Sequence, residues 1–379
     1  MRMNILIVLS IVIGLSSCES KPILKGKLTE TKFDKIYLSE IKNEYYSQYL
    51  VVDSAELKDG SFEFDLKNKS SQLYFIGNGY VGGKVFVEPT SMRIQGSLTD
   101  KNSIQWEVSG SSLHDLYKEY MEEQDVVSCQ HKKDSLNDLF YSAREKEDGE
   151  EMARIKKESH VYYSAEIRQR VDSLVKSRVK LNMDNAFGIY LYKSRIFFRL
   201  QPETVEDINN YRAYVSKFNG EAVNTDYFKH INNRLDVFEK CAIGAVAPEI
   251  IGRDTLDNET KLSDYRGKYV IVDFWSSGCK YCRLESPNLQ KAMDMYGDKN
   301  FTILGVSSDW KKDLWMNAIH EDESYWEHLK IDKENISKIM DSYCITGIPH
   351  IILVDPQGKI LAKDLREENI YEIPGKFIK

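Results

Sequence analysis

One short stretch constrains the fold of this chain more than any other. An apolar, β-branched run at residues 269–272 is followed, after Gly278, by Cys279 and Cys282 at the start of Cys-x-x-Cys-Arg-Leu-Glu. This pattern predicts a buried strand whose carboxyl end turns into a helix. Both sulfurs are then expected on the first turn of that helix.

The predicted position of the two cysteines has a chemical consequence. Unpaired N–H groups and the positive end of the helix dipole favour a thiolate, so they lower the thiol pKa. Lys280, between the cysteines, acts in the same direction. A fall in pKa from about 8.5 to about 7 would raise the thiolate fraction at neutral pH from a few per cent to roughly half. The pair is therefore suited to thiol-disulfide exchange.

Two alternatives for the cysteine pair are a structural zinc site and a structural disulfide. Zinc needs a second pair of ligands at similar spacing, whereas Cys129, Cys241 and Cys344 are scattered singly. We therefore expect no metal. A disulfide across two residues closes a loop so small that it stabilises the fold little, and such tight pairs are usually the reactive ones.

Length and charge exclude some functions. The chain has 379 residues, enough for two or three domains, and a formal net charge of −7. We find no clustered basic surface, so nucleic acid is not an expected partner.

The amino terminus has the pattern of a targeting segment. Arg2 precedes an apolar run at residues 5–15 that is too short to span a bilayer, and small residues then lead to Cys18. Residues 1–18 are therefore predicted to be a secretion signal. The sequence Leu-Ser-Ser-Cys at residues 15–18 resembles a bacterial lipobox, which implies cleavage, lipidation of Cys18 and a lipid anchor on the periplasmic side of the cell envelope. An unlipidated signal peptide and an uncleaved anchor are the alternatives.

Residues 21–110 are predicted to form an all-β, sandwich-like domain. Short alternating or β-branched runs are separated by turn signals such as Lys58-Asp59-Gly60. The predicted strands cover residues 23–29, 35–39, 49–54, 61–66, 72–76, 84–88, 92–96 and 104–108. Because the region holds no constellation of catalytic residues, we expect it to be a scaffold or to bind a partner.

Residues 111–240 are predicted to be helical. Apolar residues recur at helical spacing, and the mixed-charge run 144–158 is typical of a solvated helix face or an exposed hairpin. One helix is expected to start at Pro202, and the last to span residues 227–238. Cys129 and Cys241 are candidates for a mutual disulfide, but the sequence leaves the pairing of Cys129, Cys241 and Cys344 open.

Residues 241–379 are predicted to be an α/β domain with a partly parallel sheet. Strands are expected at residues 301–306 and 350–354, in addition to the one that leads to Cys279, and helices near 310–319 and 336–343. Residues at the carboxyl end of such a strand are well placed to form an active site.

At this point a family resemblance becomes specific. Val-Asp-Phe-Trp before Cys279, Arg-Leu-Glu-Ser-Pro after Cys282, and the late Gly347-Ile348-Pro349 resemble a TlpA/ResA-type thiol-disulfide oxidoreductase of the thioredoxin superfamily. The resemblance covers residues 241–379 and implies a thioredoxin-like fold. The β-rich and helical front half more loosely resembles the extension found on thioredoxin-like lipoproteins.

The resemblance implies roles for several residues. Cys279 would be the exposed attacking thiolate and Cys282 the buried resolving thiol. Asp273 would be a buried carboxylate that assists proton transfer at Cys282, and Glu285 an acidic residue that tunes the pKa of the sulfurs. A salt-bridged strand residue and an exposed first-turn glutamate, respectively, are the alternatives. Substrate binding would fall to Trp275, to the cis-proline Pro349 and to Ile348, whose backbone would pair with the substrate chain.

Three positions depart from the family pattern. Gly278 replaces the tryptophan that commonly precedes the first cysteine. Lys280-Tyr281 replaces a small or proline-containing dipeptide, so a redox potential cannot be transferred. His350 follows the expected cis-proline, where it would either stabilise the Cys279 thiolate as an imidazolium or pack as a neutral strand residue.

The resulting prediction is an exported, membrane-anchored thiol-disulfide oxidoreductase that reduces protein disulfides, in cytochrome c maturation or in envelope redox homeostasis. It would need no cofactor besides the Cys279/Cys282 disulfide, but it would need a membrane electron donor or acceptor. A peroxiredoxin-type thiol peroxidase is a second hypothesis, although Val272 occupies the place of that family's proline. A non-enzymatic surface binding protein is the third.

Overall fold

The computed structural model describes residues 21–29, 33–43, 48–99, 103–162 and 165–379. The chain divides into two compact units, residues 1–191 and 192–379, and each is described separately below. The predicted leader, residues 1–18 with Cys18, lies outside the described residues.

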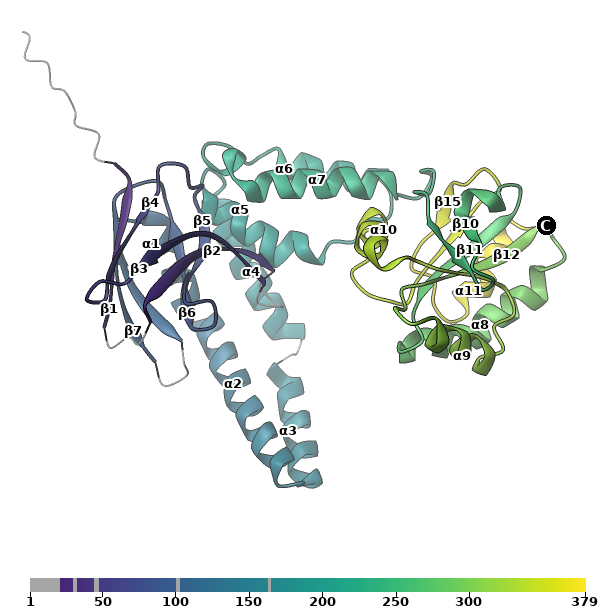
Figure 1. Cartoon of the computed structure of the whole chain (residues 1–379), viewed down its shortest axis with the longest axis horizontal. Coiled ribbons are helices and arrows are strands. Elements are labelled where there is room, and N and C mark those ends of the chain that lie inside the picture. Colours follow the sequence, from purple (N-terminus) through teal and green to yellow (C-terminus); the bar gives the residue numbers. More distant parts are fainter. Residues whose placement is uncertain (1–20, 30–32, 44–47, 100–102, 163–164) are drawn as a thin grey trace, which may run out of the picture. The chain divides into compact units, whose positions relative to one another are not determined.

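The first unit contains two four-stranded sheets (Figure 1). One sheet has the order β4-β1-β7-β8, and in it β1 and β7 are parallel while the other pairs are antiparallel. The other is an antiparallel sheet with the order β3-β2-β5-β6. The strands are β1 (Ile23–Thr29), β2 (Lys35–Asn43), β3 (Gln48–Glu56), β4 (Ser61–Asp65), β5 (Gln72–Gly77), β6 (Gly82–Val87), β7 (Met92–Leu98) and β8 (Ile104–Ser109).

The two sheets share one core. Alternate side chains of β1 are buried, as are those of β4, because successive side chains of a strand point to opposite faces. Leu24 and Phe64, which are register partners, meet Leu38 and Ile76 of the other sheet in a single apolar cluster. The predicted sandwich-like β domain is therefore confirmed, with a strand at each predicted run.

Helices follow the sheets in the first unit. They are α1 (Ser112–Glu122), α2 (Gln124–Glu145), α3 (Gly149–Tyr162), α4 (Ala165–Leu181) and α5 (Ala186–Leu191). The α1 helix begins where the Ser111 side chain accepts a hydrogen bond from the His114 N–H, which satisfies one of the free donors of the first turn.

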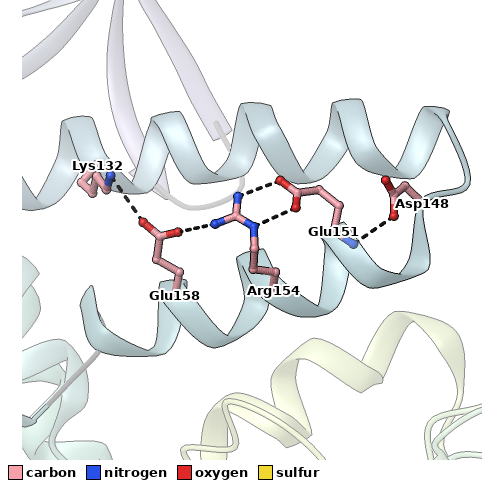
Figure 2. A network of polar contacts seen from close by, with 5 residues as sticks. All are labelled: Lys132, Asp148, Glu151, Arg154 and Glu158. Carbon is pink, nitrogen blue, oxygen red and sulfur yellow. Dashed lines mark hydrogen bonds and ion pairs between the residues drawn. The ribbon is translucent and has the colours of Figure 1, made fainter.

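The predicted mixed-charge run lies in a hairpin of α2 and α3 (Figure 1). Figure 2 shows its ion-pair network, in which the Arg154 guanidinium binds both carboxylate oxygens of Glu151 at 2.7 Å. Arg154 also donates to Glu158 at 3.2 Å, and Lys132 of α2 lies 3.5 Å from the same carboxylate. These charged side chains are partly exposed, as expected of a solvated hairpin.

The second unit begins with helical segments. Its longer helices before the sheet are α6 (Val205–Val215) and α7 (Asp226–Lys240). The α6 helix starts three residues later than predicted from Pro202, because Thr204 and Asp207 form a reciprocal capping box at its first turn. Thr225 caps α7 by accepting a hydrogen bond from the Phe228 N–H at 3.2 Å.

A seven-stranded sheet with the order β10-β9-β13-β12-β11-β14-β15 forms the rest of the second unit. The central β11 is parallel to β12 and antiparallel to β14. The strands are β9 (Ile251–Asp254), β10 (Glu259–Lys261), β11 (Tyr269–Trp275), β12 (Phe301–Ser307), β13 (Glu327–Lys330), β14 (His350–Val354) and β15 (Ile360–Ala362). The helices are α8 (Lys280–Tyr296), α9 (Lys312–Glu321), α10 (Ile336–Ser342) and α11 (Asn369–Glu372).

The β11 strand presents alternate residues to two helical layers. Ile271 packs in one cluster with Leu289 and Ala292 of α8, and Trp275 packs with Cys282 of α8 and Trp315 of α9. Phe274, on the opposite face, has its ring 5.0 Å from that of Tyr343, which follows α10. Because side chains alternate along a strand, Asp273 faces the α8 side with Ile271 and Trp275.

The sequence analysis identified β11, β12 and β14 but not the shorter β9, β10, β13 and β15, which have three or four residues each. Within the described part of the chain, no helix is both long and apolar enough to cross a membrane.

Candidate active site

The two cysteines lie where β11 turns into α8. Cys279 is the N-cap residue of α8, and its sulfur accepts a hydrogen bond from the Cys282 N–H at 3.1 Å. The two sulfurs are joined in a disulfide, with an S–S distance of 2.04 Å. The helix N-terminus therefore directs an N–H group at Sγ of Cys279, as the strand-to-helix pattern predicts.

The two sulfurs differ in access to solvent. Cys282 is 3 % exposed and packs with Trp275 and Trp315, whereas Cys279 is half-buried. The carbonyl oxygen of Ile348 lies 3.8 Å from Sγ of Cys279, and the Ile348–Pro349 peptide bond is cis. A substrate sulfur can therefore approach Cys279 far more readily than Cys282.

The loop before Cys279 is held by a side chain that the sequence analysis missed. Both carboxylate oxygens of Asp309 accept hydrogen bonds from Ser277, one from its N–H at 2.8 Å and one from its hydroxyl at 2.7 Å. The hydroxyl of Ser307, at the end of β12, also donates to Asp309 at 2.8 Å. Because β12 is parallel to β11, the two strands end at the same edge of the sheet, which brings these residues together.

Asp273 is the buried carboxylate of the site. It is 5 % exposed, and burial raises the pKa of its carboxyl group to about 7, with a smaller contribution from the charge of Glu285 and an opposing one from Arg366. Its Oδ1 atom has no hydrogen-bond partner among the described residues. A carboxyl group in this state can take up or release a proton near neutral pH.

Glu285 is also buried and links α8 to the segment after β15. It is 9 % exposed, and its Oε2 atom accepts hydrogen bonds from the Asn288 side chain at 2.8 Å and from the Glu367 N–H at 3.1 Å. Glu285 follows Cys282 by one turn of α8, and its charge helps to raise the pKa of the Asp273 carboxyl group.

The segment after β15 anchors the cis-proline turn. The Arg366 guanidinium donates to the Pro349 carbonyl oxygen and lies 3.6 Å from the Asp364 carboxylate. Asp364 in turn lies 3.1 Å from Nδ1 of His350, a contact that lowers the pKa of the Asp364 carboxyl group. His350 is therefore a buried residue at the start of β14 whose imidazole contacts the Asp364 carboxylate.

Trp275 occupies a different place from the one its expected role requires. It is 5 % exposed, so it has almost no surface for a substrate. Its ring packs beneath the site, in the cluster that contains Cys282, and lies 5.7 Å from the His328 ring. The end of β11 is covered by α8 and α9, and this burial could not be seen from the motif alone.

The first turns of α8 combine an ion-paired arginine with exposed apolar side chains. Arg283, next to Cys282, makes ion pairs of 2.6 Å with Asp322 and 2.8 Å with Glu321, which join the start of α8 to the end of α9. Tyr281 and Leu284 are 72 % and 60 % exposed on the first turns of α8. The fixed helix start thus carries an apolar surface beside the half-buried sulfur.

The arrangement is built for sulfur chemistry. It combines an accessible sulfur at a helix N-terminus, a buried partner sulfur, and a carboxyl group that titrates near neutral pH. In the residues that the structure describes, no group of three or more His, Cys, Asp or Glu could hold a metal ion.

Comparisons with known proteins find similarities in both units. Residues 243–363 match the AhpC/TSA family, and residues 23–117 match a domain of unknown function, DUF4369. The thiol-disulfide oxidoreductase ResA of a Bacillus cereus strain is 28 % identical over 137 residues, which cover 36 % of this chain and 78 % of ResA. ResA of Geobacillus kaustophilus is 29 % identical over 119 residues, 31 % of this chain and 67 % of the relative.

A solved structure is also similar. The thioredoxin domain of a thiol-disulfide oxidoreductase from Bacteroides vulgatus shares 49 % sequence identity, with a TM-score of 0.36; the match covers 36 % of this chain and 99 % of that domain.

Proposed function

Because the chain belongs to the ResA/TlpA-like thiol-disulfide oxidoreductases of the thioredoxin superfamily, we propose that it reduces disulfides in protein substrates with Cys279 and Cys282. One observation carries this proposal, namely the difference in access between the two sulfurs. Cys279 is half-buried at the N-terminus of α8, while Cys282 is buried behind it.

In the first step, the reduced protein presents Cys279 as a thiolate, which the Cys282 N–H and the dipole of α8 stabilise. The thiolate attacks one sulfur of the substrate disulfide. A mixed disulfide with Cys279 forms, and the other substrate sulfur leaves as a thiolate. The backbone of Ile348, beside Cys279, would hold the substrate chain by pairing with it as a strand would.

In the second step, Asp273 accepts the proton of the Cys282 thiol. The Cys282 thiolate then attacks Sγ of Cys279, which closes the disulfide and releases the second substrate sulfur. A pKa of about 7 suits Asp273 to this transfer, because the group is then part ionised at neutral pH. Glu285, whose charge helps to raise this pKa, is assigned a tuning role.

Tyr281 and Leu284 are proposed to contact the substrate in place of Trp275. Both are exposed apolar side chains on the first turns of α8, next to Cys279. Such residues bind unfolded or partly folded chains with little sequence preference, which suits a reductase of many protein disulfides.

We also propose that the protein is exported and anchored by a lipid on Cys18, on the periplasmic side of the cell envelope. The leader-like sequence of residues 1–18 supports this location. Electrons would then come from a membrane donor, and the substrates would belong to cytochrome c maturation or to envelope redox homeostasis. Residues 21–110 and the helical region 111–240 are proposed to be a scaffold or a partner-binding surface for the redox domain 241–379.

The direct test is reduction of insulin disulfides by the full chain, with dithiothreitol as the source of electrons. The wild-type chain should accelerate the reaction and the Cys279→Ser variant should not. The equilibrium reduction potential of the pair then gives the direction of electron flow. A value near −270 mV, that of thioredoxin, would support a reductase, and a value near −120 mV would make the protein a disulfide donor.

Peroxide reduction is the competing function, because residues 243–363 match the AhpC/TSA family. It uses the same Cys279 nucleophile but needs hydrogen peroxide as the oxidant. Consumption of peroxide by the reduced chain, faster than its reaction with insulin disulfides, would favour this alternative.

A further inference from the structure

A second pair of cysteines lies away from the candidate site. Cys241 is the C-cap residue of α7, and Cys344 follows α10 with a φ angle of 58°. They are 0 % and 3 % exposed, and the structure has both as free thiols. Although they are far apart in the sequence, the fold of the second unit brings their side chains into contact.

The two thiols form a sulfur-sulfur hydrogen bond, and a lysine ammonium lies close to one of the sulfurs. The Cys344 thiol donates to Sγ of Cys241, and Nζ of Lys363 lies 3.9 Å from the same sulfur. Arg234 of α7 adds a second positive charge. This set is unusual for two buried structural thiols, because uncharged thiols need no cations around them.

The same contacts shift the pKa values of the two thiols in opposite directions. The hydrogen bond from Cys344, together with the charges of Lys363 and Arg234, lowers the pKa of the Cys241 thiol, although burial opposes the change. That hydrogen bond and burial raise the pKa of the Cys344 thiol. The carboxyl end of α7 disfavours an anion, so the two cations compensate for an otherwise poor position. Cys241 is therefore the sulfur that ionises first.

We propose that Cys241 and Cys344 are a second redox pair, which closes into a structural disulfide by exchange with a disulfide of a protein or a small thiol compound. The Cys241 thiolate attacks one sulfur of the incoming disulfide, so a mixed disulfide forms and one thiolate leaves. Cys344 then gives its proton to the departing thiolate and attacks Sγ of Cys241, which releases the second thiol. Two thiols of the chain are oxidised as one disulfide is reduced to two thiols.

Burial sets the order of events. An incoming disulfide cannot reach sulfurs that are 0 % and 3 % exposed in the folded chain, so the exchange takes place late in folding, on a partly open form in which Lys363 and Arg234 already lie near Cys241, and the closed bond is afterwards protected from reductants. The closed bond joins the end of α7 to the segment that leads to Ile348 and Pro349, and it encloses the whole of β11 and α8. Long enclosed loops are those that a disulfide stabilises most, in the chain-entropy account.

The neighbouring backbone already holds Cys344 in place. The Tyr343 hydroxyl donates to the Pro248 carbonyl oxygen, and the Cys344 and Ile345 N–H groups donate to Asp341 at 3.1 Å and Met340 at 2.9 Å. Fixed partners of this kind reduce the rearrangement that bond formation requires.

The test uses the full chain with Cys279→Ser and Cys282→Ser, so that the first pair is absent. The protein is unfolded with reductant and refolded in buffers of oxidised and reduced glutathione. It is then quenched with acid, alkylated and mapped by mass spectrometry without reduction. A peptide pair joined through Cys241 and Cys344 is expected, together with a higher midpoint of urea unfolding than after full reduction. Adding Cys344→Ser should abolish both results.

Wild-type protein gives a second readout that does not depend on the variant's folding. Brief treatment with dithiothreitol should open Cys279–Cys282 and leave Cys241–Cys344 closed. The inference is overturned if Cys241 and Cys344 remain thiols in every refolding buffer, or if Cys241 is found joined to Cys129. Neither experiment measures insulin reduction, so its outcome is separate from that of the proposed function.

Discussion

The second unit holds two cysteine pairs in opposite electrostatic settings. Cys279 is at the N-terminus of α8, where helix N–H groups favour an anion, and it is half-buried. Cys241 is at the carboxyl end of α7, where an anion is disfavoured, and it is fully buried against Cys344 and Lys363. A helix N-terminus thus supplies both charge stabilisation and access, whereas the buried pair needs added cations and has no access.

The largest expected difference between the pairs is in catalysis. Cys279→Ser should lower the rate of insulin reduction to background, roughly a thousandfold or more, because the attacking sulfur is lost. Cys241→Ser should keep the rate within about twofold, since that sulfur does not face the substrate. Equal losses in the two variants, with circular dichroism unchanged, would remove the distinction between the pairs.

The next effect concerns proton transfer, which only the first pair is expected to need. Asp273→Asn should slow resolution of the Cys279 mixed disulfide by about a hundredfold, because a general base is removed. The wild-type rate should rise with pH up to about 7, the pKa of Asp273, while the variant should lack this rise. Stopped-flow measurement of the resolution step would give both results. A pH profile shared by the two proteins would exclude Asp273 as the base.

Asp273 should also make the free energy of unfolding depend on pH. Burial raises its folded-state pKa from 3.8 to about 7, so between these pH values the folded protein holds a proton that the unfolded chain has lost. Stability then falls as pH rises through this window, by up to roughly 4 kcal/mol for a shift of this size. Urea unfolding from pH 4 to pH 8 should show this decline in the wild type and a flatter curve in Asp273→Asn. A steeper decline in the variant would contradict the assigned shift.

The smallest effect tests the loop that presents the first pair. Asp309→Ala removes the carboxylate that accepts both Ser277 hydrogen bonds, so insulin reduction should fall severalfold through loss of positioning, by about 1 kcal/mol or somewhat more. The matched control is Asp313→Ala, which removes an exposed carboxylate of the first turn of α9. A loss in the control as large as that in Asp309→Ala would show that the loop contacts are not responsible.

Part of the fold and of the candidate site could be predicted from the sequence. The apolar run, Gly278 and the two cysteines predict the strand-to-helix turn, because those features are adjacent in the chain. The strands of the first unit are predictable for the same reason, since alternation and turn residues are local signals. A short strand such as β13 has too few residues to show an alternation of apolar and polar side chains.

What the sequence could not give depends on contacts between distant residues. Asp309 reaches Ser277 only because β11 and β12 are parallel neighbours, and Arg366 reaches Pro349 from beyond β15. The sequence left the pairing of Cys129, Cys241 and Cys344 open, and the fold brings Cys344 to Cys241; the side chain of Cys129 lies outside the described part. No local pattern marks any of these pairs.

The most direct test of the central claim is to trap the mixed disulfide. The Cys282→Ala variant, reduced and then mixed with oxidised insulin, should accumulate a covalent adduct through Cys279, because the resolving sulfur is absent. The Cys279→Ala variant should give almost none, since Cys282 is buried. Non-reducing electrophoresis and peptide mapping would identify the sulfur involved. An adduct that forms equally well on Cys282 would contradict the assignment of Cys279 as the attacking thiolate.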